Sequence, residues 1–189
     1  MTTIVAVQGN GWVVVGWDAR VAEDGGRVFN AGKNWSKVVR NNGYLLGAAG
    51  DVRAINLLHH VFHPAKADGL TGIKLDRFMT GKFIPSLREV FESEGYMAGS
   101  RSQAEEHGST VLVVVNGVVF EIGSDWAWVR DESGLYAIGS GGDYALGVLA
   151  VSDVSTVDAC KQSVLASLKV ASRFDAATAS PFFTQSVLT

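Results

Sequence analysis

Two short apolar runs separated by Gly9-Asn10-Gly11 open the chain and constrain its fold more than any other feature. They span residues 2–8 and 12–17 and are rich in β-branched and other apolar residues. An Asn-Gly step between two such runs favours a tight hairpin. A turn at this step pairs residues whose numbers add to about 20 or 21, as antiparallel register requires. The sequence therefore predicts a hairpin that places Thr2 opposite Asp18 or its neighbour.

Thr2 directly follows the initiator methionine, so removal of Met1 would leave a hydroxyl and a free α-amine on one residue. An α-amine has an unperturbed pKa of about 7.7–8.0, so a good fraction of it is neutral near pH 7. Such a residue can act as a nucleophile and as its own base. The alternative is that Thr2 is an ordinary second residue.

Asp18 is an unusual residue for the end of an apolar hairpin. An unpaired charge is costly to bury, so a buried Asp18 needs a cationic partner. The alternative is that Asp18 ends its strand in solvent.

A series of short motifs occurs in a characteristic order along the chain. The motifs are Thr2-Thr3-Ile4-Val5, the Asn10-Gly11 turn, Val13-Val14, Asp18, Lys37-Val38, Gly47-Ala48-Ala49-Gly50-Asp51 and Ile138-Gly139-Ser140-Gly141-Gly142. Their order and approximate spacing resemble those of proteasome β-type subunits, and most of all the bacterial HslV peptidases. The resemblance extends from residue 2 to about residue 180. It implies a single proteasome β-like peptidase domain over residues 1–189.

The resemblance assigns Thr2 the role of nucleophile after loss of Met1. It makes Asp18 the buried acid that fixes a lysine, and Lys37 the lysine that lowers the cost of deprotonating the hydroxyl. Lys33 competes with Lys37 for this role. Lys33 lies in a loop-like segment, whereas Lys37 begins the strand-like run that continues with Val38 and Val39, so we favour Lys37.

Further roles come from the same resemblance. The backbone N–H of Gly47 would face the developing oxyanion, and Ser140 would hydrogen-bond the terminal amine. Asp175 and Thr178 would support Ser140 and the amine, with Thr178 standing where relatives have serine. Residues that would line the substrate pocket are Val21, Ala22, Trp35, Leu45, Ala49 and Arg53.

Strands apolar on both faces indicate the layer architecture. The first two strands have this character, as does the run from Thr110 to Phe120 around its own Asn116-Gly117 turn. Such strands need cover on both sides. A helix layer on one face and a second sheet on the other would provide this cover. This is the α+β, four-layer αββα sandwich of the N-terminal nucleophile hydrolases that the resemblance implies, whereas composition alone indicates only a generic α+β fold. We expect strands near 2–8, 12–18, 36–39, 43–48, 110–115, 118–122, 126–130 and 135–139, and helices near 51–63, 75–95, 141–152 and 156–173.

The composition of the chain limits the classes of binding partner that we expect. The chain has 189 residues, a net charge of −3 and a pI near 5.8, which gives no electrostatic reason to expect nucleic acid or a membrane as partner. A single cysteine excludes an intrachain disulfide, and the absence of a signal-peptide pattern makes the cytoplasm the expected location. His59, His60 and His63 cluster without a suitably placed Glu or Cys, so we expect no catalytic metal.

The resemblance thus implies a threonine-type endopeptidase of a self-compartmentalised ring. The resemblance implies peptide or unfolded protein as substrate, a homo-oligomeric double ring and an AAA+ unfoldase as a candidate partner. No cofactor is expected, although a monovalent or divalent structural ion is compatible with the reading. The alternatives are a non-peptidase amide hydrolase of the same superfold and a catalytically inactive ring-forming subunit.

Overall fold

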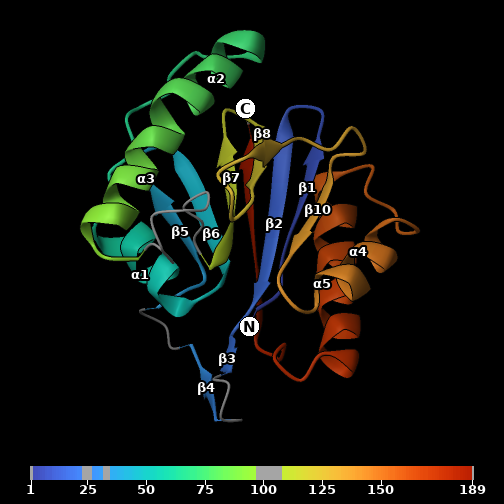
Figure 1. Cartoon of the computed structure of the whole chain (residues 1–189). Helices are drawn as coiled ribbons and strands as arrows, with labels where there is room; N and C mark the ends of the chain where they lie inside the picture. Colours follow the sequence, from blue (N-terminus) through green and yellow to red (C-terminus); the bar gives the residue numbers. More distant parts are fainter. Residues whose placement is uncertain (1, 23–26, 32–34, 97–107, 189) are drawn as a thin grey trace.

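Two β-sheets lie face to face between two layers of helices in the computed structural model of the chain (Figure 1). The structure describes residues 2–22, 27–31, 35–96 and 108–188. Its mixed α+β architecture is the four-layer αββα sandwich predicted from the sequence. A small hairpin of β3 (Arg20–Ala22) and β4 (Val28–Asn30) protrudes from the end of the molecule where the N-terminus lies.

The N-terminal hairpin forms the centre of one sheet. The strands β1 (Ile4–Gly9) and β2 (Trp12–Asp18) are flanked by β10 (Leu135–Ile138) and β11 (Phe182–Leu188) in the order β10-β1-β2-β11. Ile4 pairs with Trp17, which confirms the predicted register. The turn depends on Gly11, whose φ of +79° lies in the left-handed region that glycine adopts readily.

The second sheet has the order β5-β6-β7-β8-β9. Its strands are β5 (Val38–Asn41), β6 (Tyr44–Gly50), β7 (Ser109–Val115), β8 (Val118–Ile122) and β9 (Trp128–Val129). The predicted turn between the third and fourth of these strands is present, with Asn116 and Gly117 both at positive φ. All neighbouring strands in the sheet are antiparallel.

Each sheet has its own helix layer (Figure 1). The second sheet is covered by α1 (Val52–His60), α2 (Gly72–Phe78), the π-helical turn η1 (Met79–Phe83) and α3 (Ile84–Ser93). The N-terminal sheet is covered by α4 (Gly142–Leu149) and α5 (Val157–Phe174). In place of the single helix predicted over residues 75–95, the structure has a helical segment from Gly72 to Ser93 that is interrupted by a π-turn. Among the described helices, none is both long and apolar enough to span a bilayer.

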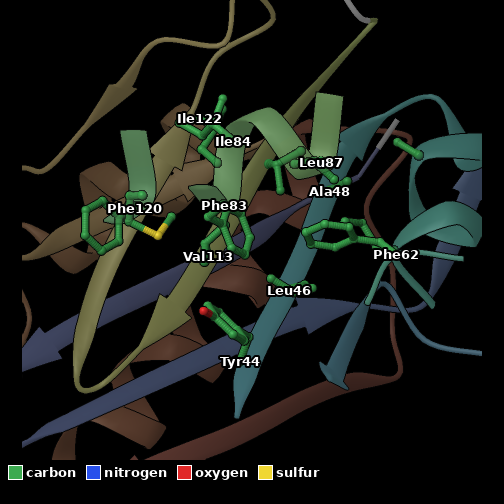
Figure 2. Close-up of a cluster of buried hydrophobic side chains, with 14 of the residues drawn as sticks. Tyr44, Leu46, Ala48, Phe62, Phe83, Ile84, Leu87, Val113, Phe120 and Ile122 are labelled. Atoms are coloured by element: carbon green, nitrogen blue, oxygen red, sulfur yellow. The ribbon is translucent and has the colours of Figure 1, made fainter. Parts of the chain in front are cut away.

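Three hydrophobic clusters fill the interfaces between the four layers. The first lies between the second sheet and its helices, where Leu46 and Ala48 of β6 pack against Phe62 and Phe83 (Figure 2). The second lies between the sheets and includes Leu45 and Ala49 from the opposite face of β6. This alternation follows from the period-two geometry of a strand, and it directs the odd-numbered residues of β6 towards the N-terminal strands.

Three strands were not predicted, and one is less than half as long as predicted. The strands β3, β4 and β11 are half-buried or exposed along most of their length, so they lack the buried apolar pattern by which the other strands were recognised. The strand expected at 126–130 contains only Trp128–Val129, because Trp126 adopts a φ of +67° that strand backbone does not have.

Cys160 supplies a first testable prediction. It is fully buried in the third cluster, between α5 and the N-terminal sheet, and burial raises the pKa of its thiol to about 11. We expect it to resist iodoacetamide at pH 8 in the native protein and to react once the protein is unfolded, because the thiolate is the reactive form. The buried Cys160 thiol contributes fully to the stability of the fold at pH values below the ordinary thiol pKa. This contribution is lost as the pH rises towards 11. Mass spectrometry of the alkylated protein tests this; rapid native labelling would contradict the burial.

Candidate active site

Asp18 and Lys37 form a buried ion pair at the end of β2. Lys37 Nζ lies 2.6 Å from Asp18 Oδ1, and both side chains are fully buried. Asp18 also accepts hydrogen bonds from the backbone N–H groups of Thr3, Arg20 and Ala179. The expected cationic partner of Asp18 is therefore Lys37. Lys33, the competing lysine, lies outside the described residues.

The environment of Lys37 favours proton transfer. Burial lowers the pKa of its ammonium, while the charge and hydrogen bond of Asp18 and the charge of Asp175 act in the opposite direction. Desolvation disfavours the charged amine, whereas a nearby carboxylate favours it. Lys37 is thus a cation fixed by Asp18 that gives up its proton more readily than a surface lysine.

A second polar cluster forms where the two helices of the N-terminal sheet meet. Asp175 is the C-cap of α5, and Ser140 immediately precedes the N-cap of α4. Ser140 Oγ donates to Asp175 Oδ2 at 2.8 Å, and Thr178 Oγ1 donates to the same oxygen at 2.5 Å. The structure therefore brings together the three residues that the resemblance grouped near the terminal amine.

Close backbone packing joins this cluster to the N-terminus. Gly139 has a φ of +93°, and a Cβ built on it would lie 1.9 Å from the carbonyl oxygen of Thr2 and 3.2 Å from Ala49 Cβ. Thr2 is 3% exposed. Only glycine fits so close to another backbone, so Gly139, the residue before Ser140, lies directly against Thr2.

Gly47 lies in the middle of β6, opposite Val38, the residue that follows Lys37. A Cβ on Gly47 would approach Ile4 Cδ1 to 3.0 Å and Val38 Cγ2 to 3.2 Å. Because β5 begins at Val38, the pairing of β6 with β5 ends at Gly47. Gly47 is therefore a close-packed position at the point where β6 loses one of its strand partners.

The predicted pocket residues come from different parts of the fold. Val21 and Ala22 are half-buried in β3, and Leu45 and Ala49 belong to the cluster between the sheets. Leu45 is only 2% exposed, so it has little surface to offer a ligand in the single chain.

The other two predicted pocket residues form hydrogen bonds in which one partner lies on α1. Trp35 Nε1 donates to Asn56 Oδ1 at 3.0 Å. Arg53, on α1, donates from its guanidinium to the carbonyl oxygen of Glu94.

Three contributors to the site were not identified from the sequence as site residues. Arg20 and Ala179 act through backbone N–H groups, which every residue but proline carries, so no sequence signal marks them. Thr3 differs, because the register that pairs Ile4 with Trp17 also sets Thr3 against Asp18. The hairpin register could therefore have identified Thr3.

Comparison with known proteins identifies solved structures with the same fold. No protein-family model matches the sequence, and no curated protein matches it significantly. BPH from Thiobacillus denitrificans in complex with epoxomicin is similar with a TM-score of 0.77 and 18% identity, covering 99% of this chain and 98% of that one. Eukaryotic HslV from Trypanosoma brucei gives a TM-score of 0.66 and 22% identity, with full coverage of both chains. This chain has the HslV fold.

A second structure of BPH from Thiobacillus denitrificans gives the same result, with a TM-score of 0.75, 19% identity and coverage of 99% and 98%. Likeness to HslV and BPH at these identities establishes the fold. A fold hosts many chemistries, so the function must be argued from the side chains.

Proposed function

We propose that this chain is a threonine-type endopeptidase subunit of a self-compartmentalised, proteasome-like ring, with processed Thr2 as its nucleophile. The observation that carries the proposal is the convergence on residues 2 and 3 of the buried Asp18–Lys37 pair and of the partly exposed cluster of Ser140, Asp175 and Thr178. A buried ion pair is weak evidence for stability, because its desolvation cost offsets most of its attraction. A titratable group whose pKa is lowered by burial beside a specific charge partner, as that of Lys37 is, is instead typical of an active site.

In the proposed mechanism, chemical roles fall to the hydroxyl and α-amine of Thr2, to Lys37 and to Gly47. Once Met1 is removed, the Thr2 α-amine takes the proton of the Thr2 hydroxyl as Oγ1 attacks the peptide carbonyl carbon. The Lys37 cation lowers the cost of the forming alkoxide, and the Gly47 N–H stabilises the oxyanion. The ammonium then protonates the leaving amine, which breaks the C–N bond and leaves an ester on Thr2. Water, deprotonated by the same amine, hydrolyses that ester and restores the hydroxyl.

The support for a peptide substrate is the end of β6 that does not pair with β5. Beyond Gly47, β6 continues without pairing to β5, and an extended peptide can bind such an edge as an added strand. Pocket specificity would come from Val21, Ala22, Trp35, Leu45, Ala49 and Arg53. One solved structure of BPH, which has the same fold, is a complex with epoxomicin, so this compound is a suitable first inhibitor to test on the chain.

The proposed assembly is a homo-oligomeric double ring in the cytoplasm. It would act on unfolded protein delivered by an AAA+ unfoldase, without nucleic acid or membrane as partner. Catalysis by Thr2 and Lys37 requires no cofactor.

Intact-mass analysis combined with a peptidase assay tests the proposal. We expect the native protein to lack Met1 and to hydrolyse fluorogenic peptides faster than small amides. Thr2→Ala should reduce kcat/KM by about 10⁴–10⁶-fold, as loss of a nucleophile does, while light scattering reports the same multi-subunit particle. Retention of Met1 in the native protein, or full activity of Thr2→Ala, would refute the mechanism. A stable monomer would refute the ring.

A further inference from the structure

Thr3 contributes to both polar clusters of the candidate site. Its backbone N–H donates to Asp18 Oδ1 at 3.0 Å, and its side-chain oxygen lies 2.5 Å from Thr178 Oγ1. Thr3 is 0% exposed, so its hydroxyl has no access to solvent. The mechanism proposed above gives this hydroxyl no role.

The donors and acceptors of the second cluster fit one consistent arrangement. Thr178 Oγ1 donates to Asp175 Oδ2, and a hydroxyl carries a single proton. Thr178 must therefore accept from Thr3, whose hydroxyl is the donor in the short contact between them. Ser140 also donates to Asp175 Oδ2, which leaves the Ser140 oxygen as an acceptor. A chain of hydrogen bonds thus runs from the Thr3 hydroxyl through Thr178 to Asp175, and Asp175 also accepts a hydrogen bond from Ser140.

Gly141 leaves the space that this chain occupies. A Cβ at position 141 would lie 2.2 Å from Thr3 Oγ1, 2.8 Å from Thr178 Oγ1 and 3.1 Å from Asp175 Oδ2. Any side chain there would displace these oxygens. Hydroxyl groups linked in series polarise one another, so the orientation of each member depends on the others.

We propose that the Thr3 hydroxyl is a positioning group for catalysis, which fixes Ser140 beside the amine of processed Thr2 by way of Thr178 and Asp175. The inference rests on the proposed function. Because Thr3 is fully buried, it cannot contact substrate. Its loss should therefore lower kcat and leave KM unchanged.

Paired substitutions test this role. Thr3→Val removes the hydroxyl and keeps the side-chain shape, and we expect kcat to fall by about 3- to 10-fold, the worth of one hydrogen bond. Thr3→Ser keeps the hydroxyl and should restore kcat. Thr178→Val breaks the chain at its next member and should cause a similar loss, and the double variant should lose no more than the larger single loss. Ser167→Ala is the matched control, because it deletes a buried hydroxyl that bonds only the Val164 carbonyl among the contacts described.

The outcomes are distinct. Wild-type kcat in Thr3→Val, or a Thr3→Ser enzyme as impaired as Thr3→Val, overturns the inference. If Thr3→Val does not fold, Thr178→Val decides: an undiminished kcat overturns the inference, and a reduced kcat with wild-type KM supports it.

If the wild-type chain hydrolyses no peptide, the proposed function fails and the inference is judged on amine reactivity instead. Thr2 is then exposed by cleavage of an N-terminal fusion, and the rate of α-amine acylation is compared in wild type and Thr3→Val. A changed rate supports the positioning role, and an unchanged rate overturns it.

Discussion

Replacing Lys37 with methionine is expected to abolish peptide hydrolysis and to destabilise the fold by about 3–5 kcal/mol, because removal of one partner leaves a buried charge uncompensated. Methionine is close to lysine in length but carries no charge, so Asp18 loses its 2.6 Å ion pair while its backbone donors remain. On the catalytic side, the lost cation no longer stabilises the forming alkoxide, and loss of one such preorganised group costs about 10²–10³ in rate. Denaturant unfolding at fixed protein concentration and kcat/KM on a fluorogenic peptide measure the two effects.

A second substitution separates stability from catalysis. The double variant Asp18→Asn/Lys37→Met has no charge at either position of this pair, so we expect it to regain part of the lost stability. The regain is partial, because one asparagine oxygen cannot accept from Thr3, Arg20 and Ala179 as the carboxylate does. Activity should stay absent, since the lysine is still missing.

Lys161→Met is the matched surface control. Its ion pair with Asp158 is exposed and 3.5 Å long, and such pairs contribute little to stability. Neither stability nor rate should change by more than experimental error. Peptidase activity in Lys37→Met close to wild type would refute the role of the lysine, whatever the stability of the variant.

The residues of the site differ in how far the sequence could identify them. Asp18 was recognisable because an acid at the end of an apolar hairpin demands a partner, and that partner is present in Lys37. Ser140 and Asp175 came from resemblance alone, since no local pattern relates residues so far apart in the chain. Their contact depends on the ends of α4 and α5 meeting, which is a property of helix packing.

The strand β11 shows a limit of local pattern. Phe182–Leu188 contains Thr, Gln and Ser, and its residues are half-buried except for the exposed Phe183 and Leu188. It is a strand because it pairs with β2 from Phe182 opposite Asp18 to Leu188 opposite Trp12. That long-range pairing, rather than intrinsic propensity, decides its conformation, and it brings Ala179 within hydrogen-bonding distance of Asp18.

Peptidase activity is expected to appear when Thr2 becomes the first residue of the chain and to be absent when one residue precedes it. An N-terminal fusion can be cut by a specific protease to leave either Thr2 or Gly-Thr2 at the new terminus. In the second form the Thr2 nitrogen belongs to an amide and cannot accept the hydroxyl proton, so the rate should fall by about 10²–10⁴-fold, the worth of a positioned base. Every side chain of the site is the same in both forms.

A time course of fusion cleavage gives the most direct comparison of the two forms. Activity should rise in proportion to the fraction of chains that mass spectrometry finds beginning at Thr2. Released Thr2→Ser should be active because it keeps a hydroxyl and an amine, and released Thr2→Ala should be inactive because it keeps only the amine. Equal rates from the Thr2 and Gly-Thr2 forms would mean that the α-amine is not the base. Lys37, whose pKa burial already lowers, would then be the group to test as base.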